Sequence, residues 1–391
     1  MDETGQQREH RATRIRGIGT SVFAEMSALA RQYNAVNLGQ GFPDFDGPPE
    51  IRQAAADAIM AGHNQYAISH GETPLREAIA AHALRFYGQE VDPNTEITAT
   101  SGATEALFCS ALAFIEPGDE VIIFQPAYDS YVPGIRMAGG VPVAVTLHAP
   151  EFRFDPGELR AAFTERTRAI YINTPHNPSG TVFTREELEL IASLCCEHDV
   201  LAITDEVYEH IVFTGNAHHR LATFPDMWER TLTISSGGKS FSLTGWKVGW
   251  GIGPAPLTNA LRSTHQFAVF AGTTPVQHAI AQALHLPDAY YAGLAADYQA
   301  RRDFLCDALA AAGLAPRVPE GSYFILANIE STPFATGLEF SRHLVREAGV
   351  ASIPLDSFYL DPSHGEKYVR FCFCKRWETL EAGAARLKRI A

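Results

Sequence analysis

The sequence predicts an α/β protein with a large domain on a mostly parallel, helix-covered sheet and a smaller α+β domain. The chain has 391 residues, which is too long for one compact core. Apolar strand-like runs alternate with helical patterns over residues 46–285, and this alternation changes toward the C-terminus. We therefore predict a disordered tail (1–16), an N-terminal arm with part of the small domain (17–45), the large domain (46–285) and the C-terminal small domain (286–391).

The individual elements follow from the spacing of apolar residues. Helical spacing predicts helices over 21–33, 49–62 and 71–87, with a short strand over 35–38. Apolar runs predict the strands of the large sheet at 120–124, 141–146, 168–173, 200–204, 231–235 and 248–253. The segments between them predict helices near 104–115, 129–138, 156–164 and 185–198. Strands that alternate with helices in this way are typical of a parallel sheet with helices on its faces.

The C-terminal third shows a different order of predicted helices and strands. Two long helical zones are predicted, over 255–286 and 288–312. The segments 322–327, 337–348, 351–354, 368–373 and 377–390 follow and mix strand and helix patterns, which indicates the smaller α+β unit.

Composition and charge exclude several classes of protein. Lysine and arginine total 31 against 45 aspartates and glutamates, a net charge of −14 that disfavours a nucleic-acid partner. The first sixteen residues lack the apolar segment of a signal peptide, and no apolar run approaches the roughly 20 residues of a membrane span. A GxGxxG fingerprint is absent, so a dinucleotide-binding dehydrogenase is unsupported. We expect a cytoplasmic protein without a membrane partner.

The cysteines do not suggest a metal site. None of the six forms a CxxC pair, and two of them alternate along a strand-like run, so that they face the same way. We expect them to be small buried side chains in a reducing compartment, with no metal bound. They are Cys109, Cys195, Cys196, Cys306, Cys372 and Cys374.

The most informative segment is the Ser/Gly-rich stretch at residues 235–250. It places Lys239 directly after the strand-like run 231–234, among small neighbours. Such a lysine is sterically open and easily desolvated, so it can lose its proton and act as an imine-forming nucleophile. The alternative is a surface loop in which Lys239 and Lys247 are simply solvated.

Other strand ends carry residues suited to the same site, because ligands of open α/β sheets bind beyond the carboxyl ends of the strands. Asp205 follows the run 200–204 and could pair with a protonated ring nitrogen, or it could cap a helix. Asn177 follows the run 168–173 and could hydrogen-bond a ligand oxygen, or it could form an Asn-Pro turn.

A third strand end predicts a place for an anion. Residues 101–104 (SGAT) open a helix, whose N–H groups and dipole suit a phosphate, although ordinary capping explains them equally. Ser236 and Lys247 could add phosphate donors. Tyr128 follows another strand end and could stack on a flat ring, or it could pack in the core.

Arg370 lies inside the apolar run 368–373. A buried guanidinium needs a partner, which predicts either a bidentate grip on a ligand carboxylate or an internal salt bridge. The nearby Gly-rich strand start at 321–324 favours the ligand.

Seven segments together match one family. They are NLGQGFPDF (Asn37–Phe45), NQY (Asn64–Tyr66), SGATEAL (Ser101–Leu107), NTPHNPSG (Asn173–Gly180), TDEVYEH (Thr204–His210), SSGGKSFSLTGWKVGW (Ser235–Trp250) and YVRFCF (Tyr368–Phe373). From about Val36 to its C-terminus the chain resembles the class I pyridoxal-phosphate aminotransferases of fold type I. It is most similar to the branch of bacterial methionine aminotransferases and kynurenine (glutamine) transaminases.

The resemblance implies a cofactor, pyridoxal 5′-phosphate, and a role for each matching residue. Lys239 would attach the cofactor and later move the proton, Asp205 would hold the ring-nitrogen proton, and Tyr208 would complete the catalytic set. The implied cofactor contacts also include Gly102, Ala103, Thr104, Tyr128, Asn177, Ser236, Lys247 and, from the neighbouring subunit, Tyr66. The implied substrate contacts are Arg370, Gly39 and Asn177 for the carboxylate, and Phe23, Tyr66, Tyr128, Phe270 and Phe358 for the side chain.

Two departures from the family pattern concern the substrate. Ala271 stands where kynurenine-preferring relatives have histidine, and Asp356 stands where relatives carry a small polar residue. No second arginine is clearly placed for a distal carboxylate. The sequence therefore predicts a homodimeric ping-pong transaminase of neutral amino acids, methionine first and then glutamine, aromatic donors or kynurenine, with 2-oxo acids as acceptors. The alternatives are β-elimination from cysteine S-conjugates at the same site and, less favoured, a non-enzymatic regulator with this fold.

Overall fold

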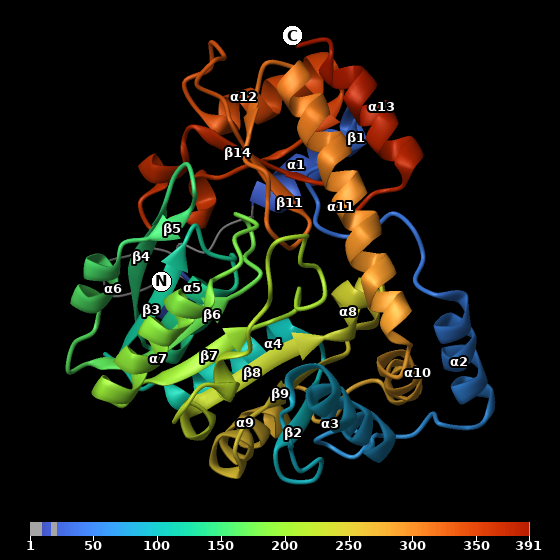
Figure 1. Ribbon diagram of the computed structural model, residues 1–391, viewed down its shortest axis with the longest axis vertical. Coiled ribbons are helices and arrows are strands. Elements are labelled where there is room, and N and C mark those ends of the chain that lie inside the picture. Colours follow the sequence, from blue (N-terminus) through green and yellow to red (C-terminus); the bar gives the residue numbers. More distant parts are fainter. Residues whose placement is uncertain (1–9, 17–21, 391) are drawn as a thin grey trace.

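The computed structural model describes residues 10–16 and 22–390 and is organised around one large and one smaller sheet (Figure 1). The large sheet has the strand order β2-β9-β8-β7-β6-β3-β4-β5. Its strands are β2 (Ile97–Thr100), β3 (Glu120–Gln125), β4 (Val141–His148), β5 (Arg153–Phe154), β6 (Thr167–Asn173), β7 (Leu201–Asp205), β8 (Thr231–Ser236) and β9 (Gly249–Ile252). The central run β8-β7-β6-β3-β4 is parallel, whereas β9 is antiparallel to β8 and β2, and β5 to β4. The predicted, mostly parallel α/β sheet is thus confirmed.

Helices cover both faces of this sheet. On β3, Ile122 packs with one set of helices and Ile123 with the other, because successive strand residues point to opposite faces. One face carries α6 (Pro156–Ala162) and α7 (Arg185–His198), and the other carries α4 (Ala103–Phe114), α5 (Tyr131–Ala138) and α9 (Ala255–Ala268). Burial on both faces explains why the central strands read as continuous apolar runs.

The smaller sheet lies in the upper part of Figure 1 and is antiparallel, in the order β10-β11-β14-β13. Its strands are β10 (Ala315–Pro316), β11 (Phe324–Asn328), β13 (Ile353–Pro354) and β14 (Tyr368–Cys372). β1 (Val36–Asn37) pairs in parallel with β12 (Val350–Ala351), which brings the N-terminal arm to the C-terminal part of the chain. The helices of this part are α1 (Val22–Gln32), α12 (Gly337–His343) and α13 (Trp377–Leu387), and α11 (Asp288–Ala311) runs up to it from the large sheet (Figure 1).

The remaining helices are α2 (Pro49–Met60), α3 (Thr73–Tyr87), α8 (Gly237–Ser240), α10 (Thr274–Leu284) and a π-helical turn at Leu344–Ala348. Of these, α3 and α10 lie in the lower part of Figure 1, α2 at its right and α8 near its middle. Short 3₁₀ turns lie at Thr13–Ile15, Leu221–Thr223, Trp228–Arg230, Thr244–Trp246, Asp356–Phe358 and Pro362–Gly365. None of the helices in the described ranges is both long and apolar enough to cross a membrane.

Two expectations differ from the structure. The helical zone predicted over 255–286 is two helices, α9 and α10, because Phe270 has a positive φ of 73° and Pro275 opens the next helix. Of the predicted disordered tail, residues 1–9 lie outside the described part, while Thr13–Ile15 form a 3₁₀ turn beside α5.

Candidate active site

The carboxyl ends of the parallel strands meet at one edge of the large sheet. The register pairs Asn173 of β6 with Asp205 of β7, and Asp205 with Ile234 of β8, two residues before Ser236. A cavity of about 290 Å³ opens at this edge. Among the residues that line it are Phe23, Gly102, Ala103, Thr104, Tyr128, Asn177, Asp205, Tyr208, Ser236, Lys239, Lys247 and Arg370. The fold thus brings together most of the site residues that the sequence predicts.

Lys239 projects into this cavity from the single-turn helix α8, which follows the end of β8. Its Nζ lies 5.8 Å from the ring centre of Tyr208 and 5.7 Å from that of Tyr323. Within residues 10–16 and 22–390, no carboxylate forms an ion pair with it. Burial lowers the pKa of Lys239, while Cys374 and Asp205 partly oppose that shift. The alternative of a solvated surface lysine is therefore wrong for Lys239.

Asp205 is a buried carboxylate whose two oxygens are unequally hydrogen-bonded. The Tyr131 hydroxyl donates to Oδ2 at 2.7 Å, whereas Oδ1 receives only the Val207 N–H at 3.4 Å. Burial raises the pKa of Asp205 to about 6, against the lowering effect of the Tyr131 hydrogen bond. No helix begins after Asp205, since residues 207–210 form a turn, so the helix-cap alternative is wrong. Because a carboxylate oxygen has two lone pairs, Oδ1 can accept a further hydrogen bond from a ligand N–H.

Asn177 and Arg370 form a second polar group on the cavity wall. Arg370 Nη1 donates to Asn177 Oδ1 at 2.9 Å, and Nη2 donates to the Gly39 carbonyl at 3.0 Å. Its Nε is buried and has no hydrogen-bond partner, and no ion pair to Arg370 occurs within the described residues. The internal salt bridge considered from the sequence is therefore absent from that part of the chain. Unused N–H groups remain for an incoming carboxylate.

The start of α4 forms a cradle for an anion. Gly102 has a φ of 78°, which favours glycine, and a Cβ there would lie 3.1 Å from Lys247 Nζ. Gly249 of β9 passes so close that a Cβ would come within 2.5 Å of the Ala103 nitrogen. The first-turn N–H groups of a helix have no intrahelical partner. With the Lys247 ammonium close by and Ser236 lining the same cavity, this end of the site suits a phosphate.

Aromatic rings surround the guanidinium of Arg370. Its central carbon lies 4.0 Å from the ring centre of Phe324, 5.1 Å from that of Phe23 and 5.3 Å from that of Phe358. Phe23 and Phe358 also contact each other edge to face at 5.6 Å. Phe358 therefore supports the cavity wall, although it does not itself line the cavity.

Tyr128, predicted to stack on a ring, and Tyr208, predicted to hydrogen-bond the cofactor, both line the cavity. Tyr128 is half-buried and packs edge to face on Tyr131 at 5.6 Å. Tyr208 is 3% exposed and contacts Tyr323 at 5.0 Å between ring centres. Burial raises the pKa of both phenols, so both keep their protons and can donate hydrogen bonds at neutral pH.

Three residues lie outside the cavity lining: Tyr66 and Phe270, which were predicted for the substrate pocket, and Asp356, which departs from the family pattern. Tyr66 is 86% exposed and contacts Phe270, itself 41% exposed, at 5.3 Å. Neither lines the cavity of its own chain. Asp356 accepts the N–H of Ser357 at 2.7 Å and also stays outside the cavity lining. The assignment of Tyr66 to a neighbouring subunit's site stays a prediction.

Two positioning contacts were not foreseen. Asn173 donates from Nδ2 to the Asp205 carbonyl at 2.8 Å and accepts the Asn177 N–H at Oδ1 at 2.7 Å, which ties two predicted site residues together. Gln40 donates from Nε2 to the Phe23 carbonyl at 3.0 Å and to Ser27 Oγ at 2.6 Å, which fixes α1 against the cavity. The only sequence signal for Asn173 is its place as the last residue of a strand.

The cysteines are free thiols within the described residues, and all except the half-buried Cys196 are buried. Cys372 and Cys374 point to the same side, as their spacing predicts, with their Sγ atoms 3.0 Å apart.

Comparison with known proteins places this geometry in context. The profile of the family "Aminotransferase class I and II" matches residues 33–387. A probable N-succinyldiaminopimelate aminotransferase of Mycobacterium tuberculosis is 46% identical over 97% of the chain and 98% of the relative. A methionine aminotransferase of Escherichia coli is 42% identical over 95% and 96%, respectively. Their solved structures each superpose with a TM-score of 0.94 over 97% of this chain and 100% of the neighbour, at 46% and 41% identity. A kynurenine–oxoglutarate transaminase 1 of Mus musculus is 41% identical over 96% of each chain.

Proposed function

The chain belongs to the class I and II aminotransferase family, and we propose that it transfers the amino group of neutral L-amino acids, methionine first, to a 2-oxo acid. The observation that carries the proposal is the donor set in one cavity. It combines a lysine with no ion-pair partner among the described residues, a buried carboxylate with an oxygen able to accept a further hydrogen bond, an anion cradle and a guanidinium with unused N–H groups.

The residues present fit the family's cofactor, pyridoxal 5′-phosphate. The start of α4, Ser236 and Lys247 would hold its phosphate, and the Asp205 carboxylate would accept a hydrogen bond from its protonated ring nitrogen. Asn177 and Tyr208 would donate to its phenolic oxygen, and Tyr128 would stack on its ring. When bound, this cofactor acts as an electron sink that stabilises negative charge at the substrate α-carbon.

The chain's own groups would then bind the substrate and move the proton. Lys239 would hold the cofactor covalently, and the lowered pKa of its Nζ suits it to remove and return the α-proton. Arg370 would bind the α-carboxylate through its unused N–H groups, with Asn177 and the Gly39 carbonyl fixing the guanidinium. Phe23 and Phe358 would keep water from the reacting carbon.

The preference for a neutral donor rests on the charges around the cavity. The cations that line it are Lys239, Lys247 and Arg370, and each has a role in the proposal above. A donor with a distal carboxylate would need another cation. The apolar wall formed by Phe23, which Phe358 supports by ring contact, suits a thioether side chain.

We also propose a cytoplasmic homodimer. Tyr66 and Phe267 are 86% and 91% exposed, and Phe270 beside Tyr66 is 41% exposed. Exposed apolar side chains that contact one another mark interaction sites, and Phe267 lies three residues before Phe270 in the chain, so we place the dimer interface over this region, with Tyr66 reaching the neighbouring subunit. Six free thiols favour a reducing compartment.

A panel of amino donors tests the substrate proposal. Each donor is mixed with the cofactor-loaded enzyme without an acceptor, and the loss of the cofactor's visible absorption gives the rate constant. The panel contains methionine, glutamine, kynurenine, aspartate and N-succinyl-LL-diaminopimelate. We expect methionine to react fastest and aspartate slowest. A clear preference for the succinylated donor would overturn the neutral-donor proposal while leaving the aminotransferase class intact.

A further inference from the structure

A buried ion cluster lies behind the segment that carries Asp205 and Tyr208. These two residues line the cavity, whereas Glu206 and Glu209, between and after them, bind Arg220. Arg220 Nε donates to Glu206 Oε2 at 3.0 Å, and Nη2 donates to Glu209 Oε2 at 2.9 Å. We call Arg220, Glu206 and Glu209 the Arg220 cluster.

The Arg220 cluster is buried and packs against Tyr87. Arg220 is 2% exposed, Glu206 1% and Glu209 6%. The guanidinium carbon lies 3.7 Å from the ring centre of Tyr87, whose hydroxyl donates to Glu209 at 2.5 Å. Burial acts to raise the pKa of both carboxyls, but the Arg220 guanidinium, together with His218 beside Glu206 and the Ser235 hydroxyl beside Glu209 among other neighbours, leaves the net pKa lowered, so both stay ionised at neutral pH. Buried charges are tolerated only when they are paired in this way.

The cluster holds the immediate neighbours of two cofactor-site residues. Glu209 Oε1 accepts the hydroxyl of Ser235 at 2.6 Å, and Ser235 precedes Ser236. Glu206 Oε1 accepts the hydroxyl of Thr204 at 3.0 Å, and Thr204 precedes Asp205. One arginine therefore fixes the ends of β7 and β8 and the turn between Asp205 and Tyr208, all from the side away from the cavity.

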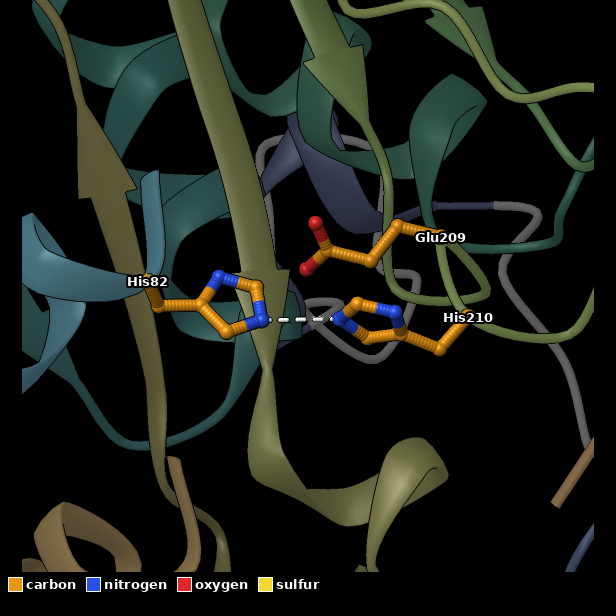
Figure 2. Close-up of side chains that lie close together, drawn as sticks. All are labelled: His82, Glu209 and His210. Carbon is orange, nitrogen blue, oxygen red and sulfur yellow. Dashed lines mark hydrogen bonds between the residues drawn. The ribbon is translucent and has the colours of Figure 1, made fainter. Parts of the chain in front are cut away.

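Two histidines attach α3 to the same turn (Figure 2). The Nε2 atoms of His82 and His210 face each other at 2.7 Å, with Glu209 beside them. Burial lowers the pKa of His82 to about 4 and that of His210 to about 3, so both rings are neutral and share one N–H···N hydrogen bond. The Glu209 oxygens already accept from Arg220, Tyr87 and Ser235. The trio is thus better described as an extension of the cluster than as a metal site.

We propose that Arg220 is a positioning residue: its fork holds Glu206 and Glu209 so that Asp205, Tyr208 and Ser236 keep their geometry toward the cofactor. The inference rests on the proposed function. The proposed role goes beyond stabilising the fold, because Thr204 and Ser235, which the cluster holds, directly precede Asp205 and Ser236, which line the cavity.

The test compares Arg220→Lys with a matched control, Arg153→Lys. Arg153 also bridges two carboxylates, at 2.7 Å from Glu187 and 2.7 Å from Glu320, but it lies outside the cavity lining. A lysine keeps the charge in each case and loses the fork. The readouts are the dissociation constant of pyridoxal 5′-phosphate, the pH midpoint of its bound visible absorption, and the thermal midpoint.

We expect Arg220→Lys to weaken cofactor binding about 10- to 100-fold, by analogy with the loss seen when the hydrogen-bond partners that orient metal ligands are removed. The absorption midpoint reports the proton on the nitrogen that joins Lys239 to the cofactor. It should move to higher pH, because a displaced Asp205 holds the ring-nitrogen proton less firmly, and a ring without that proton withdraws less charge from the joining nitrogen. Arg153→Lys should lower only the thermal midpoint. Unchanged cofactor affinity and an unchanged absorption midpoint in Arg220→Lys would overturn the inference, even if its stability falls.

A second variant covers the case in which Arg220→Lys does not fold. Glu206→Gln keeps the shape of the side chain and removes one ion pair, and it is judged by the same two cofactor readouts. Failure of the proposed function would look different, since the wild-type protein itself would then fail to transaminate any donor of the panel.

Discussion

Substitution of Arg370 by lysine gives the sharpest test of substrate binding at this site. Arg370 uses one N–H on each terminal nitrogen for Asn177 and the Gly39 carbonyl, and its Nε–H has no partner. Three N–H donors therefore remain, enough for a bidentate grip on a carboxylate. Lysine keeps the charge but offers a single point of contact, and it leaves Asn177 Oδ1 or the Gly39 carbonyl without a donor.

The expected loss can be worked out from these contacts. Each hydrogen bond to a charged group contributes about 1.5–3 kcal/mol, so losing one of two to the substrate, with a looser geometry for the other, costs about 2–4 kcal/mol. At 1.4 kcal/mol per factor of ten, the specificity constant for methionine should fall roughly 30- to 700-fold. Cofactor affinity should stay within about twofold, because the fork faces the substrate end of the cavity.

The assay is single-turnover reaction of the cofactor-loaded enzyme with L-methionine, followed by visible absorption. The matched substrate is 3-(methylthio)propylamine, which is methionine without its carboxylate. Wild type and Arg370→Lys should react with this amine equally slowly. If the variant lost the same factor toward both compounds, or lost nothing toward methionine, the assignment of Arg370 to the α-carboxylate would be refuted.

Three further outcomes follow from the structure. Burial raises the pKa of Asp205 from its ordinary 3.8 to about 6, so its charge costs the cofactor-free fold about 3 kcal/mol above pH 6 and nothing below pH 3.8. Urea titration of cofactor-free Asp205→Asn should therefore show a gain of about that size at pH 8 that vanishes at pH 4, and a loss at pH 8 would contradict it. Gly102→Ala should weaken cofactor binding and destabilise the fold by about 1–3 kcal/mol in cofactor titration and thermal melts, because of its positive φ and the nearby Lys247 ammonium. The control Gly245→Ala, where a Cβ meets nothing within 4 Å, should change little. If the proposed homodimer uses this surface, Phe267→Asp, at a side chain 91% exposed, should shift the light-scattering mass from dimer toward monomer, and an unchanged mass would contradict that interface.

Much of the fold could be predicted because its signals are local. The strand ending at Asp205 and the helix starting after Gly102 are set by apolar runs and by glycine, which nearby residues decide. The break between α9 and α10 was missed although Gly272 and Pro275 mark it in the sequence, whereas the positive φ at Phe270 leaves no pattern of its own.

Some residues of the site could be predicted from the sequence, and others could not. Lys239, Asp205 and Asn177 could be predicted because each follows a strand whose end a parallel sheet places at one edge. Arg220 could not, since it lies in a connection far from those strand ends, and only folding brings it to Glu206 and Glu209. The predicted role of Tyr66 stays untested for another reason: Tyr66 is exposed on its own chain, and the role requires a second chain.

Multiple-turnover transamination by Lys239→Ala tests the central role of this lysine most directly. Purified wild type and variant, each with added pyridoxal 5′-phosphate, receive L-methionine and a 2-oxo acid, and formation of the methionine-derived 2-oxo acid is followed by chromatography. Lys367→Ala serves as control, since Lys367 lies outside the cavity and donates to the Phe334 carbonyl. We predict sustained turnover in wild type and control and none in Lys239→Ala, with an unchanged circular dichroism spectrum. Substantial turnover by a folded Lys239→Ala would contradict the mechanism.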